Sequence, residues 1–158
     1  MKKRKLFREL GKGFFESESE INKIFRDTPF INDTYYAFQT EQEMFLVMEL
    51  CTGGTLFDFL RKLPNSMINY DIVRFYTAEV IIALEYVHAQ NVMYRDLKPE
   101  NILIDIDGHI KLTDFGLSKI MKTRNDMSET FCGSPEYLAP EMIFGQKYSR
   151  LVDFYTLG

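Results

Sequence analysis

A short polar stretch in the second half of the chain contains the side chains best suited to chemistry. Residues 94–101 read Tyr-Arg-Asp-Leu-Lys-Pro-Glu-Asn, and an Asp-Phe-Gly triplet begins at Asp114, thirteen positions after Asn101. Together they supply a carboxylate that can act as a base (Asp96), a cation (Lys98) and two oxygen ligands for a metal (Asn101 and Asp114). Phosphoryl transfer uses such a set, because the attacking hydroxyl must be oriented, the developing charge neutralised and magnesium held between phosphate oxygens. The stretch therefore predicts phosphoryl-transfer chemistry.

Each of the two motifs has an ordinary structural explanation when it is taken alone. A lone aspartate in a loop is usually a turn former or a cap, and Asp-Phe-Gly is a tight turn. Their order and spacing favour a function, because a strand pair fits between them. Residues 102–104 read as a buried strand, Asp107-Gly108 as a hairpin turn and residues 109–113 as the returning strand. The hairpin is expected to bring Asp114 back to the first motif.

The remaining elements are predicted from hydrophobic periodicity and from turn residues. A helix is expected over residues 5–26 and ends before Pro29; residues 34–39 and 44–49 form an antiparallel hairpin; residues 55–63 form a short helix; and a longer helix, capped by Asn69 or Asp71, runs through Ala89. The longer helix is expected to bury one stripe, formed by Val73, Tyr76, Val80, Leu84 and Val87. His88, near its end, is interpreted as a hydrogen-bonded packing residue.

Length and composition restrict the class of protein. At 158 residues, with 46% hydrophobic and 27% charged residues, the chain is typical of one globular domain. Nineteen basic and twenty-three acidic residues give a net charge of −4, which argues against a nucleic-acid surface. Cys51 and Cys132 lack the paired spacing of a zinc site, so a reducing compartment is expected, the cytoplasm with the nucleus as the alternative. No apolar run is long enough for a membrane segment.

These motifs resemble the catalytic segment of eukaryotic serine/threonine protein kinases. Tyr94 in place of the common histidine, and the Phe-Cys-Gly triplet at residues 131–133, resemble the AGC group, which contains protein kinases A, B and C. The resemblance implies an α+β, bilobal, kinase-like fold that is truncated. Residues 1–50 would form part of the small lobe, residues 51–55 the hinge, and residues 56–158 part of the large lobe with the activation loop.

The resemblance also implies roles for the two motifs, with ATP and Mg2+ as cofactors and Ser/Thr hydroxyls of proteins as acceptors. Asp96 would orient or accept the proton of the acceptor hydroxyl, and Lys98 would stabilise charge on the transferred γ-phosphate. Asn101 and Asp114 would hold Mg2+. Leu103 would form the floor of the adenine pocket.

Further nucleotide contacts are expected at the hinge and on the first helix. By resemblance, the carbonyl of Glu49 and the N–H of Cys51 bond the adenine edge. Glu20 is chosen as the helix glutamate that pairs with a lysine of the preceding strand, and Glu16 and Glu18 stay open as alternatives. One turn after Glu20, Ile24 would pack toward Phe115.

The activation loop carries the regulatory residues that the resemblance implies. Thr130 matches the site that an upstream kinase phosphorylates, and Arg95 and Lys119 match the cations that receive the phosphate. Ser134 matches the position that bridges the base and the lysine, and it marks serine/threonine specificity. Glu100 favours a basic protein substrate, although Thr55 departs from the glutamate that usually supports this preference.

Two parts of the family pattern are not found. The chain has no glycine-rich G-x-G-x-x-G loop and no strand lysine of the V-A-I-K type, and both ends look cut. The sequence therefore predicts a partial catalytic domain that is poorly folded and nearly inactive when made alone. The alternative interpretation is a non-catalytic, kinase-like module that binds or regulates a partner.

Overall fold

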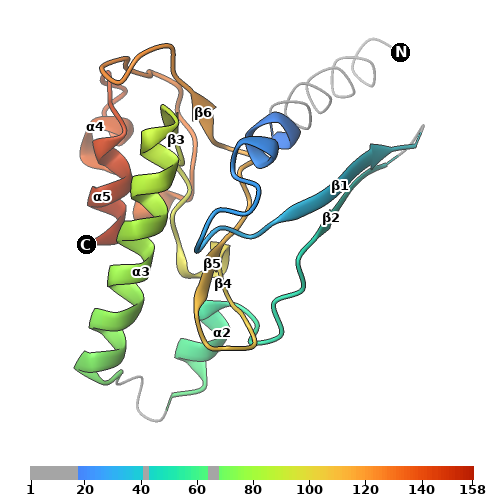
Figure 1. Cartoon of the computed structure of the whole chain (residues 1–158). Coiled ribbons are helices and arrows are strands. Elements are labelled where there is room, and N and C mark those ends of the chain that lie inside the picture. Colours follow the sequence, from blue (N-terminus) through green and yellow to red (C-terminus); the bar gives the residue numbers. More distant parts are fainter. Residues whose placement is uncertain (1–17, 41–42, 64–67) are drawn as a thin grey trace.

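The computed structural model describes residues 18–40, 43–63 and 68–158 (Figure 1). Residues 18–24 are helical and are followed by β1 (Thr34–Gln39), β2 (Met44–Met48), α2 (Leu56–Arg61), α3 (Tyr70–Ala89), β3 (Val92–Met93), β4 (Ile102–Ile104), β5 (Ile110–Leu112), β6 (Lys119–Ile120), α4 (Pro140–Ile143) and α5 (Leu151–Leu157). Short 3-10 turns lie at Pro99–Asn101 and Pro135–Tyr137. The first half of the helix expected over residues 5–26, including Glu16, lies outside the described residues.

The strands form three separate antiparallel pairs. β1 pairs with β2, and this ribbon extends away from the helices (Figure 1). β3 pairs with β6, and β4 pairs with β5. The β4–β5 turn contains Gly108 at φ 86°, a backbone conformation that glycine adopts without the steric cost of a side chain. The predicted hairpin between the two polar motifs is thus confirmed.

Helix α3 packs in the main core together with residues of both polar motifs. Asn69 caps it by accepting a hydrogen bond from the N–H of Asp71 at 2.8 Å. Of the predicted stripe, Val80, Leu84 and Val87 are buried, while Tyr76 is only partly buried and Val73 is 38% exposed. The first turns of α3 instead line an open cavity of about 890 Å3 between α2, α3 and α5.

The main core joins the first helix, α3 and both polar motifs. The buried side chains of this cluster are Ile21, Phe25, Ile31, Val80, Ala83, Leu84, Val87, Val92, Tyr94, Leu97, Ile102, Ile110, Leu112 and Phe115. Phe25 stacks on Phe115 with ring centroids 5.2 Å apart, and Tyr94 meets the edge of Phe115 at 5.3 Å. Ile24, which was expected to pack toward Phe115, is 39% exposed, and the residue that stacks on Phe115 is Phe25, the next along the chain. No helix within the described ranges is long and apolar enough to cross a membrane.

A carboxylate–imidazole pair fastens α3 to the β4–β5 hairpin. Glu79 is buried, and its Oε2 accepts a hydrogen bond from the N–H of Ile110 at 3.0 Å, while its Oε1 pairs with Nδ1 of His109. The hydrogen bond and the charge of Glu79 raise the pKa of His109, with smaller contributions from Asp105 and Asp107. Folding therefore favours the protonated imidazole.

This pair predicts a pH-dependent contribution to stability. A histidine with a raised folded-state pKa contributes stability that is complete below the unfolded pKa of about 6.5, and that is lost as pH rises through the raised value. The difference in Tm between the wild type and His109→Gln is expected to be largest near about pH 6 and to shrink above the raised pKa. Thermal unfolding at a series of pH values measures it. A difference that does not change with pH would contradict the assignment.

Candidate active site

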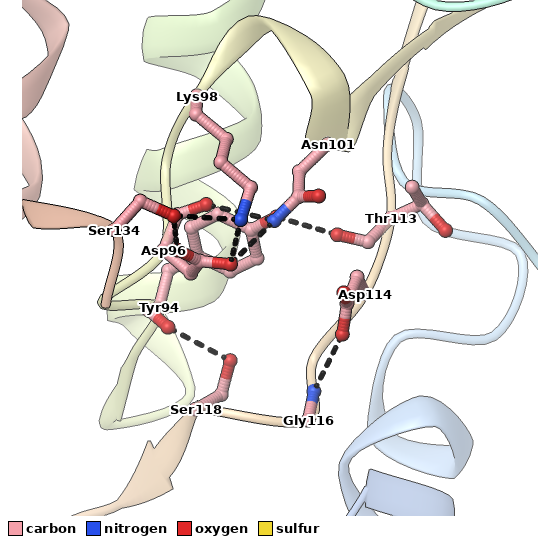
Figure 2. A network of polar contacts seen from close by, with 9 residues as sticks. All are labelled: Tyr94, Asp96, Lys98, Asn101, Thr113, Asp114, Gly116, Ser118 and Ser134. Atoms are coloured by element: carbon pink, nitrogen blue, oxygen red, sulfur yellow. Dashed lines mark hydrogen bonds and ion pairs between the residues drawn. The ribbon is translucent and has the colours of Figure 1, made fainter. Parts of the chain in front are cut away.

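The carboxylate of Asp96 is the centre of a polar network that joins three other side chains (Figure 2). Asp96 is 7% exposed, and its Oδ2 lies 2.7 Å from Nζ of Lys98 and 2.8 Å from Nδ2 of Asn101. Its Oδ1 accepts a hydrogen bond from the hydroxyl of Ser134 at 3.0 Å, and that hydroxyl accepts one from Lys98 at 2.8 Å. The network holds the carboxylate in one orientation and satisfies a charge that would be costly to bury alone.

Asn101 faces two ways in this arrangement. Its amide nitrogen donates both to the side chain and to the main-chain carbonyl of Asp96, the latter at 2.9 Å. The amide oxygen lies on the side toward Thr113 and Asp114, which follow β5 (Figure 2). An oxygen turned toward a neighbouring carboxylate fits the needs of a hard cation such as Mg2+.

Asp114 lies on a segment that adjoins the Asp96 network (Figure 2). The N–H of Thr113 donates to the carbonyl of Asn101 at 3.0 Å, so the backbone ties the two motifs together. Asp114 has φ 59°, and its Oδ1 accepts from the N–H of Gly116 at 3.2 Å. A non-glycine residue in this region costs about 1–2 kcal/mol, a cost that such residues sustain where the surrounding structure fixes them, often at functional sites.

Tyr94 connects the segment that holds Asp96 with the segment that holds Asp114. Its ring is fully buried, and its hydroxyl donates to the carbonyl of Thr113, directly before Asp114. Burial, and then the negative charges of Asp114 and Asp96, raise the pKa of Tyr94 well above its usual value of 10. The phenol therefore stays protonated and remains a donor. The sequence analysis used Tyr94 only as a feature that resembles the AGC group. The structure shows that it also positions the segment before Asp114.

Asp153 anchors the start of the catalytic loop, the segment that holds Asp96. It is 1% exposed and accepts hydrogen bonds from the N–H of Tyr94 at 3.0 Å and from the N–H of Arg95 at 2.8 Å. Its Oδ2 also lies 2.7 Å from Nε2 of His88, which agrees with the packing role expected for that histidine. These contacts hold Arg95 at φ 70°. Sequence reasoning missed Asp153, because nothing local links it to a loop 58 residues earlier.

Residues 53–55, part of the segment expected to be the hinge, lie along β4. The N–H of Gly53 donates to the carbonyl of Ile104, and the N–H of Ile104 donates to the carbonyl of Gly54, both at 2.9 Å. The half-buried Leu103 forms a bridge with Thr55. This segment is therefore fixed against the strand that follows residues 94–101.

Glu49 and Cys51, whose main chains are expected to bond the adenine edge, have side-chain partners of their own. Glu49 pairs with Lys111 of β5 at 2.9 Å, and the thiol of Cys51 lies 3.5 Å from Oδ1 of Asn32. Burial and the charge of Glu49 raise the pKa of Cys51, so its thiol stays protonated. Among the described residues, no main-chain hydrogen bond is formed by the N–H of Cys51.

Glu20 was expected to be the helix glutamate, but the structure turns Glu18 toward the Asp-Phe-Gly turn. Glu20 is exposed, whereas Glu18 is half-buried and lies beside the Asp-Phe-Gly turn. A β-carbon placed on Gly116 would lie 3.8 Å from Oε2 of Glu18. Burial, and then the charge of Asp114, raise the pKa of Glu18. The packing of Phe25 against Phe115 sets the rotation of the helix, and that rotation turns Glu18 inward.

The residues expected to be regulatory lie in or beside residues 121–141, the segment expected to be the activation loop. Arg95 and Lys119 both contact the hydroxyl of Ser128, at 3.4 Å from Nη1 and 3.1 Å from Nζ respectively. Thr130 is exposed, and its N–H also points to that hydroxyl at 3.4 Å. Ser128 was missed by the sequence analysis. Arg95 and Lys119 therefore contact Ser128, which comes two residues before Thr130, the residue whose phosphate they are expected to bind.

Comparison with known proteins agrees with this geometry. Residues 2–158 match the family described as “Protein kinase domain”. Serine/threonine protein kinase ypkA of Aspergillus fumigatus is 48% identical over 132 residues, which are 84% of this chain and 20% of that protein. RAC-beta serine/threonine-protein kinase B of Xenopus laevis is 48% identical over 130 residues, 82% of this chain and 26% of that protein.

A third relative has the same level of similarity. The cAMP-dependent protein kinase catalytic subunit of Dictyostelium discoideum is 48% identical over 130 residues, 82% of this chain and 19% of that protein. The chain thus spans about a fifth to a quarter of the length of these curated relatives. Because the family match extends over nearly the whole chain and the relatives are AGC-type kinases, the chain belongs to the protein kinase family, in the AGC group of serine/threonine kinases.

Proposed function

We propose that this chain carries the phosphoryl-transfer site of a serine/threonine protein kinase, which moves the γ-phosphate of ATP to a protein hydroxyl. The observation that carries the proposal is the Asp96 carboxylate, held by Lys98, Asn101 and Ser134 within 2.7–3.0 Å. Protein kinases as a family are enzymes that use ATP and a divalent metal. The arrangement suits that chemistry, because such transfer depends mainly on positioning and on charge stabilisation.

Asp96 keeps room for an acceptor hydroxyl. A carboxylate offers about four lone-pair positions, and Oδ1 accepts only the Ser134 hydroxyl among the described residues. A substrate hydroxyl could donate to the remaining position of Oδ1 and give up its proton there as it attacks phosphorus. Lys98, at 2.7 Å from Oδ2, would place its positive charge beside the transferred group.

The nucleotide and metal would be held by residues on both sides of the hinge. Asn101 and Asp114 provide the oxygens for Mg2+, which would neutralise charge on the phosphate oxygens. The main chain of Glu49 and Cys51 would receive the adenine edge above Leu103. Glu18, in place of Glu20, is the helix glutamate on the side of Asp114. Residues 1–50, 51–55 and 56–158 would serve as the small-lobe part, the hinge and the large-lobe part.

Regulation and location complete the proposal. Phosphorylation of Thr130 by an upstream kinase would add a charge of about −1.5 to −2 next to Arg95 and Lys119. Glu100 would contribute to binding of a basic protein substrate. Both cysteines are free, which suits the reducing cytoplasm or nucleus.

A magnesium-dependent nucleotide titration tests the proposal. Asp114→Ala removes one of two protein oxygens proposed for Mg2+, so binding of ATP in the presence of Mg2+ is expected to weaken at least about tenfold. Isothermal calorimetry measures the affinity, with and without Mg2+. Asp107→Ala is the matched control, since it removes a carboxylate from the exposed β4–β5 turn.

Two results would count against the proposal. If the wild type bound no nucleotide with Mg2+, the alternative of a non-catalytic binding module would be favoured. If Asp114→Ala and Asp107→Ala bound ATP as tightly as the wild type, the metal assignment would be wrong.

A further inference from the structure

The activation loop is fastened to the segment before α5 by a compact set of contacts. Ser128 and Tyr148 exchange two main-chain hydrogen bonds, with the N–H of Ser128 donating at 2.8 Å and the N–H of Tyr148 at 2.9 Å. Beside them, Lys147 pairs with Glu129 at 3.2 Å on the exposed surface. We call Ser128, Thr130 and Tyr148 the loop clamp.

The hydroxyl of Tyr148 makes contacts in two directions. It accepts a hydrogen bond from Nη1 of Arg95 at 3.2 Å and donates one to the carbonyl of Thr130 at 2.6 Å. The Tyr148 side chain is 2% exposed, so these polar groups have little access to water, and each bond would be costly to lose. One phenol thus links the residue next to Asp96 with the residue expected to be phosphorylated.

The clamp contacts use the main chain of Thr130 and the hydroxyls of Ser128 and Tyr148. The cations Arg95 and Lys119 already have a shared partner, since both contact the hydroxyl of Ser128, which is 1% exposed. The Ser128 hydroxyl thus partners both cations, and the Tyr148 hydroxyl partners Arg95 as well.

We propose that the Tyr148 hydroxyl is a positioning group that docks the activation loop on the catalytic loop before phosphorylation. It acts through Arg95 and the carbonyl of Thr130, and Ser128 assists it. A phosphate on Thr130 then strengthens a loop that is already docked. This inference rests on the proposed function, which places Asp96 at the reacting site and Arg95 beside a phosphate on Thr130.

Hydrogen exchange with and without a phosphate at Thr130 tests the inference. In Tyr148→Phe the ring stays and only the hydroxyl is lost, so amides of residues 127–132 are expected to exchange about tenfold faster than in the wild type. Phosphothreonine installed at position 130 supplies an alternative anchor for Arg95 and Lys119. It is expected to bring exchange in Tyr148→Phe back to within about twofold of the wild type.

Matched variants separate this effect from general destabilisation. Tyr155→Phe removes the hydroxyl of an exposed tyrosine and should leave exchange at residues 127–132 unchanged. Ser128→Ala removes the assisting hydroxyl and should also accelerate exchange there, by a smaller factor. Amides of the buried part of α3, at Leu84 and Val87, report on the fold as a whole and should not change.

Three outcomes would overturn the inference. The first is equal exchange at residues 127–132 in the wild type and Tyr148→Phe. The second is faster exchange that the phosphate does not reverse, which would indicate a packing role alone. The third is faster exchange at α3 as well. The exchange experiment contains neither nucleotide nor magnesium. Its result therefore does not depend on whether the protein binds ATP.

Discussion

Asp153→Ala is expected to lower the free energy of unfolding by about 3–5 kcal/mol, since removing one partner of a buried charged network leaves the others unpaired. The variant would leave the N–H groups of Tyr94 and Arg95 without their acceptor, and His88 without its partner. Typical domains are stable by only about 5–15 kcal/mol, so this loss threatens the folded state. Urea unfolding followed by circular dichroism measures it.

Two comparisons make this result specific to the anchor. Asp71→Ala removes an aspartate whose side chain is 75% exposed and which pairs only with Arg74, so it should change stability by less than about 0.5 kcal/mol. Asp153→Asn keeps one acceptor oxygen and should fall between the alanine variant and the wild type. If the free energies of unfolding of Asp153→Ala and the wild type differed by less than about 1 kcal/mol, the anchoring role assigned to this carboxylate would be wrong.

Gly133→Ala is expected to cost about 2–4 kcal/mol, because strain and a clash add together. Gly133 has φ 103°, and a β-carbon there would lie 2.8 Å from the carbonyl oxygen of Arg95 and 2.9 Å from Cδ2 of Leu138. The backbone would have to move next to Ser134, which bonds Asp96 and Lys98. The variant should therefore disturb the site as well as the fold.

Gly108→Ala is the matched control for Gly133→Ala. Gly108 also has a positive φ, 86°, but a β-carbon there would have no neighbour within 4 Å. It should carry only the strain of the left-handed conformation, about 1–2 kcal/mol. Thermal unfolding of both variants separates clash from strain, and equal losses in the two would show that the close approach to Arg95 does not matter.

The sequence predicted the parts of the site that are close together along the chain. Asp96, Lys98 and Asn101 lie within one loop, and Asp114 returns by a hairpin whose turn residues are easily recognised. With so little chain between them, local geometry leaves few alternative placements. The same reasoning located α2 and α3 within about two residues of their ends.

The parts that the sequence did not predict depend on distant packing. Periodicity shows that a helix has an inner face, but the choice between Glu18 and Glu20 follows from how Phe25 meets Phe115, about 90 residues later. Val73 continues the apolar spacing of α3 but lies at an open cavity. The contacts of Asp153 and Tyr148 likewise join segments more than 50 residues apart.

The bond between Ser134 and Asp96 spans 38 positions of the chain and has a consequence for the order of folding. Contacts between distant segments form late, because the loop between them must first be closed at an entropic cost. The bonds that Lys98 and Asn101 make to the same carboxylate span only two and five positions and can form earlier. The orientation of the Asp96 carboxylate is therefore complete only after residues 128–137 have packed against the loop.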